Sequence, residues 1–186
     1  MLIGNSKQAY GLVTQLLHWV TVFLIAWLFW LGFTMTDLPL SPQKFEIYGL
    51  HKSLGLTVLT LAVIRLIWRH SQPRPGFIGE MTPLERTAAH AVHMAIYVLM
   101  LAIPLTGWMY SSATAIPVSW FGLFTLPNLV GADKELGEFL QDVHEYLGIA
   151  LLVCLGLHVA GALKHHFIGR DRTLLRMLVP AKSKDG

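Results

Sequence analysis

The segment HEYLGIALLVCLGLH, residues 144–158, begins and ends with histidine and is otherwise almost wholly apolar. On an α-helix, fourteen residues advance the chain by about 21 Å and turn it through nearly four full turns. The rings of His144 and His158 therefore leave the same face of the helix at two well-separated depths. No single metal ion can reach both rings, so two ligands here would serve two sites along one helix.

The composition indicates that this helix lies in a membrane. Of the 186 residues, 54% are hydrophobic and only 13% are charged, whereas a soluble domain carries about 25% charged residues. Four apolar runs account for the excess, and each supplies the roughly 20 residues that cross a bilayer core. They cover residues 14–36, 49–69, 88–110 and 145–167. The sequence therefore predicts an all-α fold, a four-helix transmembrane bundle that forms a single domain over residues 1–186.

The first apolar run is expected to remain as a membrane helix. It is longer than a signal-peptide core of about 7–15 residues, and no small-x-small cleavage site follows it. The one cysteine, Cys154, excludes an internal disulfide, and covalent haem attachment through a C-x-x-C-H motif is excluded as well.

The placement of charge orients the predicted bundle. Basic side chains gather before the first run, between the second and third, and after the fourth: Lys7, Arg69, Arg74, Arg86, Lys164, Arg170, Arg172, Arg176, Lys182 and Lys184. The other two connections are mainly acidic and hold Asp37, Glu46, Asp133, Glu135, Glu138 and Asp142, against Lys44 and Lys134. The positive-inside rule then predicts that both termini are cytoplasmic, and it explains the basic balance without nucleic-acid binding. The aromatic segment VSWFGLF, residues 118–124, is expected at the membrane interface.

Nine histidines divide by their predicted depth. Three lie at inner helix ends among arginine and lysine, where an interfacial or solvated side chain is the simpler interpretation: His70, His165 and His166. Six lie within the apolar runs: His18, His51, His90, His93, His144 and His158. An ionisable side chain there indicates function, because burying it is costly. A single histidine could instead be hydrogen-bonded between helices, but six in four helices favour function.

At the outer level, His51 and His144 each open a predicted helix and can pair. Each has a glycine four residues later, Gly55 and Gly148, which lies one turn away on the same face. Close contact between helices would explain one such glycine. The same arrangement on both candidate partners favours room for something flat and broad, such as a porphyrin.

At the inner level, His158 could pair with His18, His90 or His93, and Gly161 adds a gap near this site. Two imidazoles on facing helices bind haem iron axially without covalent attachment. Zinc or copper would need three or four clustered ligands, which two histidines at the outer level cannot supply.

Helical spacing places two further residues beside these sites. Gly32 follows His18 by fourteen residues and is expected on the same face at the outer level. Arg65 follows His51 by fourteen residues and is expected at the inner level, where it could pair with a haem propionate. It could equally reach the membrane interface together with Arg69.

Seven segments carry a resemblance to a known family: LLHW (16–19), HKSLGLTVL (51–59), RLIWR (65–69), AHAVHMAIYVLM (89–100), PLTGW (104–108), HEYLGIALLVCLGLHVAGALKHHFIGRD (144–171) and TLLRMLVP (173–180). Together they cover nearly the whole chain and touch every predicted helix. By these segments the sequence resembles the prokaryotic cytochrome b561 family, the four-helix group that includes the cytochrome b subunits of nickel–iron hydrogenases. The resemblance implies a multi-pass protein of the bacterial inner membrane with two non-covalent b-type haems.

The resemblance also implies the axial ligands of the two haems, His18 with His158 and His51 with His144. His90 and His93 belong to the family pattern but are not carried over as ligands. They form an i, i+3 pair that we expect near the inner haem, where propionate hydrogen bonding or proton handling at a quinone site is the interpretation.

Bis-histidine ligation closes both axial positions, so we expect outer-sphere electron transfer rather than O₂ binding. The expected path runs across the membrane between a periplasmic one-electron donor and ubiquinone. Superoxide is the leading donor, as in relatives that resemble superoxide oxidases, and it would make the chain a superoxide:ubiquinone oxidoreductase. Superoxide needs no large binding pocket, and no flavin, nucleotide or iron–sulfur motif is visible for an organic two-electron donor.

Charge near the outer surface bears on this donor. Lys52 lies beside His51, and with help from Lys44 and Lys134 it could attract a small anion. Residues 37–52 and 133–145 nevertheless hold seven acidic side chains against three basic ones. Two other functions therefore remain open: an electron-carrying membrane anchor for a dehydrogenase or hydrogenase, and a non-redox scaffold or channel with structural histidines.

Overall fold

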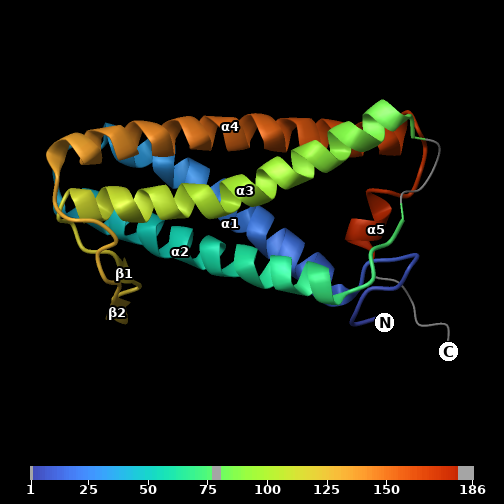
Figure 1. Cartoon of the computed structure of the whole chain (residues 1–186), viewed down its shortest axis with the longest axis horizontal. Coiled ribbons are helices and arrows are strands. Elements are labelled where there is room, and N and C mark those ends of the chain that lie inside the picture. The colour runs from blue at the N-terminus through green and yellow to red at the C-terminus, as the bar shows by residue number, and fades with distance from the viewer. Residues whose placement is uncertain (1, 77–80, 180–186) are drawn as a thin grey trace. The chain divides into compact units, whose positions relative to one another are not determined.

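The computed structural model of the protein describes residues 2–76 and 81–179. Its long helices are α1 (Leu12–Asp37), α2 (Pro42–Ser71), α3 (Pro83–Ala113) and α4 (Lys134–Phe167), and each is long and apolar enough to cross a membrane. The remaining elements of the described chain are β1 (Ser119–Trp120), β2 (Phe124–Thr125) and a short helix, α5 (Leu175–Leu178) (Figure 1). The structure is mostly helical, with four candidate membrane spans as predicted, and the side on which the termini lie stays a prediction.

The helices begin earlier than the apolar runs that predicted them. The side-chain oxygens of Ser41, Thr82 and Asp133 each accept a hydrogen bond from the backbone N–H three residues later. These are N-caps, and Thr82 with Glu85 forms a reciprocal capping box. The added turns are polar, so a hydropathy run cannot reveal them. The largest extension is in α4, which starts at Lys134 instead of residue 145.

The chain divides into two compact units, and each unit takes a part of every long helix. The first, here the terminal unit, comprises Met1–Val20, Val63–Val98 and Leu151–Gly186. The second, here the hairpin unit, comprises Thr21–Ala62 and Leu99–Ala150. The prediction that residues 1–186 function as a single membrane domain stays a prediction.

Large apolar side chains remain exposed along the outer faces of the helices. On α1, Phe23, Trp30 and Phe33 are 62–64% exposed. A helix that is apolar all round is typical of a membrane span, because lipid rather than protein covers its outer face. This surface agrees with a multi-pass membrane protein.

Charges separate between the two units. The described part of the terminal unit holds nine lysines and arginines and two carboxylates, both of which are paired, Glu85 with Lys164 and Asp171 with His165. The hairpin unit holds three lysines and seven carboxylates. This separation follows the predicted charge asymmetry. Lys182 and Lys184, which contributed to that prediction, lie outside the described residues.

The hairpin of β1 and β2 lies in the connection between α3 and α4 (Figure 1). Its turn contains Phe121 and Gly122, both with positive φ, of 48° and 73°. The backbone N–H of Phe121 donates to the Ser53 hydroxyl at 3.0 Å, and the indole of Trp120 donates to the Thr57 hydroxyl at 3.1 Å. The aromatic segment is thus fixed onto α2 within the hairpin unit, and its place at the membrane interface stays a prediction.

Candidate functional site

In the hairpin unit, α2 and α4 bring two predicted site residues together. The ring centres of His51 and His144 lie 6.2 Å apart, with an angle of 72° between the planes. An imidazole nitrogen lies about 2 Å from a bound metal ion, and the ring centre lies about 1 Å farther, so two axial rings would be about 6 Å apart. The spacing fits one metal ion between the two rings.

The hydrogen bonds of His144 decide which of its nitrogens is free. Nδ1 lies 3.0 Å from the carbonyl oxygen of Ile103 and 3.4 Å from the Thr106 hydroxyl. A carbonyl only accepts, so Nδ1 carries the proton and donates, and the lone pair on Nε2 is left for a ligand. This is the usual outer-shell arrangement for a metal-binding histidine. Nδ1 of His51 is buried and forms no hydrogen bond of normal geometry in the described chain, although the backbone of Leu28 interacts with this ring.

Four glycines lie near this pair: two are packed against the histidine rings, and two border open space. A Cβ added to Gly107 would lie 3.0 Å from Cε1 of His144, and one added to Gly32 would lie 3.6 Å from Cε1 of His51. Gly32 therefore faces the pair, as its spacing predicted. A Cβ on Gly55 or Gly148 would meet no atom within 4 Å. These two positions border open space, as required beside a broad flat ligand.

In the terminal unit, His158 of α4 meets two histidines. The ring centre of His18 lies 6.2 Å away at 60°, and that of His93 lies 5.0 Å away at 65°. The first distance equals that of the other pair and fits an ion between the rings, whereas the second is too short for this arrangement. A Cβ on Gly161 would meet nothing within 4 Å, which agrees with the predicted gap.

The remaining predicted residue of this level, His90, is placed differently. It is exposed, and its Nδ1 contacts the carbonyl oxygen of Arg86 at 2.7 Å, one turn earlier in α3. His93 is the member of the tandem that reaches the site. The expectation that both histidines lie beside the inner site therefore holds for His93, and their predicted roles stay untested.

Arginines and a tyrosine also gather beside His18. Nη2 of Arg65 lies 3.2 Å from Nδ1 of His18, and the guanidinium carbons of Arg65 and Arg69 lie 5.6 and 5.4 Å from the centre of the Tyr97 ring. Within the described residues neither arginine forms a salt bridge with a carboxylate. Two half-buried arginines thus lie on one aromatic ring, and guanidinium groups are suited to pair with carboxylates. Arg65 thus lies beside His18, and Tyr97 was not among the residues predicted to contribute to the site.

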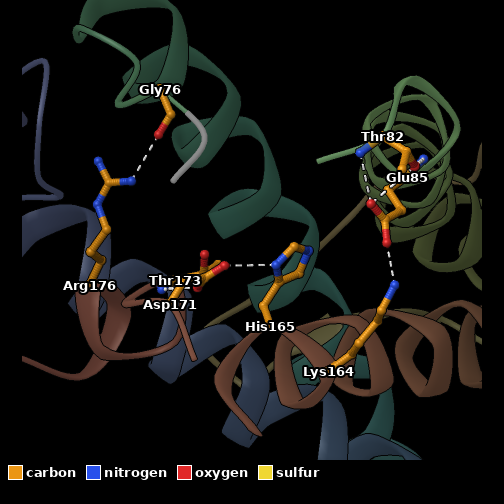
Figure 2. Close-up of polar contacts among 8 residues, drawn as sticks. All are labelled: Gly76, Thr82, Glu85, Lys164, His165, Asp171, Thr173 and Arg176. Atoms are coloured by element: carbon orange, nitrogen blue, oxygen red, sulfur yellow. Dashed lines mark hydrogen bonds and ion pairs between the residues drawn. The ribbon is translucent and has the colours of Figure 1, made fainter. Parts of the chain in front are cut away.

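The polar end of the terminal unit is held by side-chain contacts of its own (Figure 2). Nδ1 of His165 lies 2.8 Å from Asp171, which also accepts the backbone N–H of Thr173 at 2.8 Å. Partial burial raises the pKa of the Asp171 carboxyl, but the hydrogen bonds from Thr173 and His165 outweigh this and leave the pKa below its ordinary value. His165 is thus paired and only 19% exposed, which is less solvated than predicted.

The lysines predicted to attract a small anion all have partners. Nζ of Lys52 donates to the carbonyl oxygen of Pro117 at 3.1 Å, Lys44 donates to two backbone carbonyls, and Lys134 pairs with Glu138 at 3.7 Å. An ammonium has three donors, so Lys52 keeps two after this contact. The carbonyl partner leaves its charge uncompensated but fixes its position.

The donors available for a metal come in pairs. In residues 2–76 and 81–179 no group of three or more histidine, cysteine, aspartate or glutamate side chains could hold a metal ion. Two facing imidazoles suit haem, since the porphyrin supplies the other four nitrogen ligands of the iron. The spacing of both pairs, the free Nε2 of His144 and the open space beside the glycines all fit this group.

Comparison with known proteins identifies a matching family and several similar proteins. The model of the prokaryotic cytochrome b561 family matches residues 9–180. Cytochrome b561 homolog 2 of Escherichia coli (strain K12) is 34% identical over 187 residues, which cover 100% of both chains. Probable superoxide oxidase CybB of Yersinia pestis is 29% identical, with 87% of this chain and 91% of that protein covered. Cytochrome b561 homolog 1 of Escherichia coli (strain K12) is 28% identical, with 87% and 92% covered. The chain therefore belongs to the prokaryotic cytochrome b561 family, and it is a membrane electron-transport protein of a kind that binds b-type haem.

Proposed function

We propose that this protein is a two-haem cytochrome that carries electrons across the bacterial inner membrane, between a periplasmic one-electron donor and ubiquinone. The observation that carries the proposal is a repeated spacing, because each unit holds one pair of imidazole rings with centres 6.2 Å apart. His51 and His144 are the proposed axial ligands of one haem, and His18 and His158 those of the other.

The residues around each pair hold and orient the imidazoles. The Ile103 carbonyl keeps the proton of His144 on Nδ1, which fixes the ring and raises the basicity of Nε2. Bound haem supplies an iron centre that takes up and releases one electron at a time. With a histidine on each side, a bound haem would have no open coordination position for O₂.

The contact between Arg65 and His18 also bears on this proposal. A guanidinium only donates hydrogen bonds, so its contact with Nδ1 of His18 requires an unprotonated Nδ1. A neutral ring that binds a metal through Nε2 carries its proton on Nδ1, and it would then face Arg65 donor to donor. If His18 held haem iron, Arg65 would have to turn away from Nδ1, and it would then be available to a haem propionate beside Arg69 and Tyr97.

Superoxide is the donor that we propose first. One of the relatives is named a probable superoxide oxidase, and superoxide can deliver an electron without a large binding pocket. The remaining donors of Lys52, next to His51 in α2, supply a local positive charge for the anion. Ubiquinone is the lipid-soluble acceptor in this scheme.

The test is stopped-flow reduction of the oxidised protein by superoxide, with and without ubiquinone. We expect a rate constant on the order of 10⁸ M⁻¹ s⁻¹ or above that falls with ionic strength. Lys52→Glu should lower it about tenfold. Lys134→Glu makes the same change of charge at a lysine that already pairs with Glu138, ten residues before His144, and controls for net charge. Slow reduction that is indifferent to salt and to Lys52→Glu would contradict superoxide as the donor.

One observation favours a second function, an electron-carrying subunit for a dehydrogenase or hydrogenase. The hairpin unit carries seven carboxylates, and its three lysines already have partners. Such a surface repels a small anion and suits a basic partner protein. Slow superoxide reduction together with rapid reduction by a basic partner domain would select this function.

A further inference from the structure

Residues 171–179, here the C-terminal strap, contain the short helix α5, which ends against side chains of α1. The carbonyl oxygens in the last turn of a helix have no N–H partner within that helix. Nε2 of Gln15 donates to the carbonyl oxygen of Arg176 at 3.0 Å, and the indole N–H of Trp19 donates to that of Met177 at 2.8 Å. Gln15 and Trp19 are one turn apart, so one face of α1 supplies donors to two successive carbonyls of the strap.

The strap is also fixed to three other parts of the terminal unit. At its start, Asp171 lies 2.8 Å from Nδ1 of His165 in α4 (Figure 2). Farther along, the guanidinium of Arg176 donates to the carbonyl oxygen of Gly76 at 2.8 Å, in the connection between α2 and α3, and to that of Gln8 in the N-terminal segment. These contacts all lie within one compact unit. The strap is therefore held in place independently of its contact with α1.

The strap reaches the pair of His18 and His158 through the side chain of Trp19. The ring centres of His18 and Trp19 lie 5.2 Å apart, with an angle of 84° between the planes, which is an edge-to-face contact. Because the indole N–H is bonded to the strap, the indole cannot turn away from His18 without breaking that hydrogen bond. Trp19 thus limits the directions in which the His18 ring can point.

The histidines of the two pairs are oriented by different contacts. A metal-binding histidine usually has an outer-shell acceptor that orients its ring. For His144 this acceptor is the carbonyl oxygen of Ile103 at 3.0 Å. Nδ1 of His18 instead meets Arg65, which only donates hydrogen bonds and must turn away if His18 binds iron. The edge-to-face contact with Trp19 then remains to orient the His18 ring.

We propose that Trp19, fixed by the C-terminal strap, is a positioning residue for His18, and that the strap thereby sets how tightly the pair of His18 and His158 holds haem. The proposal rests on the proposed function, in which this pair ligates one of the two haems. A released strap leaves the His18 ring free to turn, and a loosely oriented ligand binds its metal more weakly. A strap that served the stability of the fold alone would leave the haem unaffected.

The experiment isolates the haem of this pair in the full-length His51→Ala protein, which we expect to retain only that haem. Haem affinity is measured by titration after haem removal. The orientation of the ligand rings is measured by electron paramagnetic resonance of the ferric haem, whose largest g value depends on the angle between the two imidazole planes. Trp19→Phe keeps an aromatic ring and removes the N–H. We expect it to raise the Kd for haem about two- to tenfold and to shift the largest g value.

A second substitution separates the strap from a local effect of the indole. Arg176→Ala leaves Trp19 unchanged and removes the guanidinium contacts that hold the strap. We expect the same direction of change in the Kd and in the g value. The double variant should not exceed the larger single effect by much, because both substitutions break one linkage. Unchanged haem binding in Arg176→Ala would show that the strap does not act on His18 and would overturn the proposal.

The matched control is Trp120→Phe, which removes an indole hydrogen bond to the Thr57 hydroxyl in the hairpin unit. It should leave the Kd and the g value of the isolated haem unchanged. Equal effects of Trp120→Phe and Trp19→Phe, or a Trp19→Phe protein that melts earlier but binds haem as the parent does, would overturn the proposal alone. Haem that persists in the His51→Ala protein after His158→Ala is added would instead contradict the ligand pair of the proposed function, and this proposal with it.

Discussion

Adding one methyl group at Gly55 tests whether a cofactor occupies the space beside the His51 ring. A Cβ at this position would meet no protein atom within 4 Å, so Gly55→Ala should cost the haem-free protein nothing. It should even stabilise α2 slightly, because alanine is favoured over glycine in helices by about 1 kcal/mol. If haem fills the space, the methyl group overpacks the site at a cost of about 1–3 kcal/mol. At 1.4 kcal/mol per tenfold, haem affinity at this pair should fall about 5- to 150-fold.

The matched control is Gly49→Ala in the same helix. Its Cβ also meets nothing within 4 Å, but residues two apart do not share a helix face, so it points away from His51. Both variants are titrated with haem after haem removal, and their helix content and melting are followed by circular dichroism. We expect weakened binding of one haem in Gly55→Ala only. Equal haem affinities in the two variants would refute a haem next to Gly55.

Gly107→Ala places a Cβ 3.0 Å from the His144 ring, so we expect the ring to shift and one haem of two to bind more weakly by about the same factor, with a matching change in the reduced α-band. Asp171→Asn removes the contact with His165. Because the pKa of Asp171 is lowered in the folded protein, this contact contributes its full stability at pH values above the range where a free aspartate ionises. That stability is lost as the pH falls through the lowered pKa. Thermal unfolding of the wild type should show this acid loss and that of Asp171→Asn should not; equal profiles would contradict it. A reporter active only in the periplasm should be silent at the C-terminus and active after Ala132, and the reverse pattern would invert the proposed topology.

Helical periodicity explains why much of the candidate site could be predicted. His51, His144 and Gly32 lie in unbroken α-helix, so counting turns along each helix placed them on faces that the structure brings together. The open positions at Gly55 and Gly148 followed from the same rule. The four spans were equally predictable, since lipid requires long apolar segments with internally paired backbone.

Contacts between different helices limited the prediction. Spacing alone could not select the partner of His158, because His18, His90 and His93 all occupy the inner level. The distances of 6.2 and 5.0 Å to His18 and His93 separate two of these candidates. Gly107 lies in the PLTGW segment, but its close approach to His144 depends on how α3 packs against α4.

The partner of Lys52, next to His51, could not be predicted for the same reason. The sequence places Lys52 beside His51 and says nothing of the carbonyl of Pro117, 65 residues away, that holds its ammonium. A hydropathy pattern also cannot anticipate the hydroxyl and indole contacts that fix the hairpin on α2. Tertiary hydrogen bonds of this kind join residues distant in sequence and leave no periodic signal.

The number of haems per chain tests the central claim most directly. A pyridine haemochrome assay on protein quantified by amino-acid analysis should give two non-covalent b haems for the wild type. It should give one for His51→Ala, one for His158→Ala and none for the double variant. A wild-type ratio of one, or a ratio of two that survives both substitutions, would contradict the assignment of the two histidine pairs.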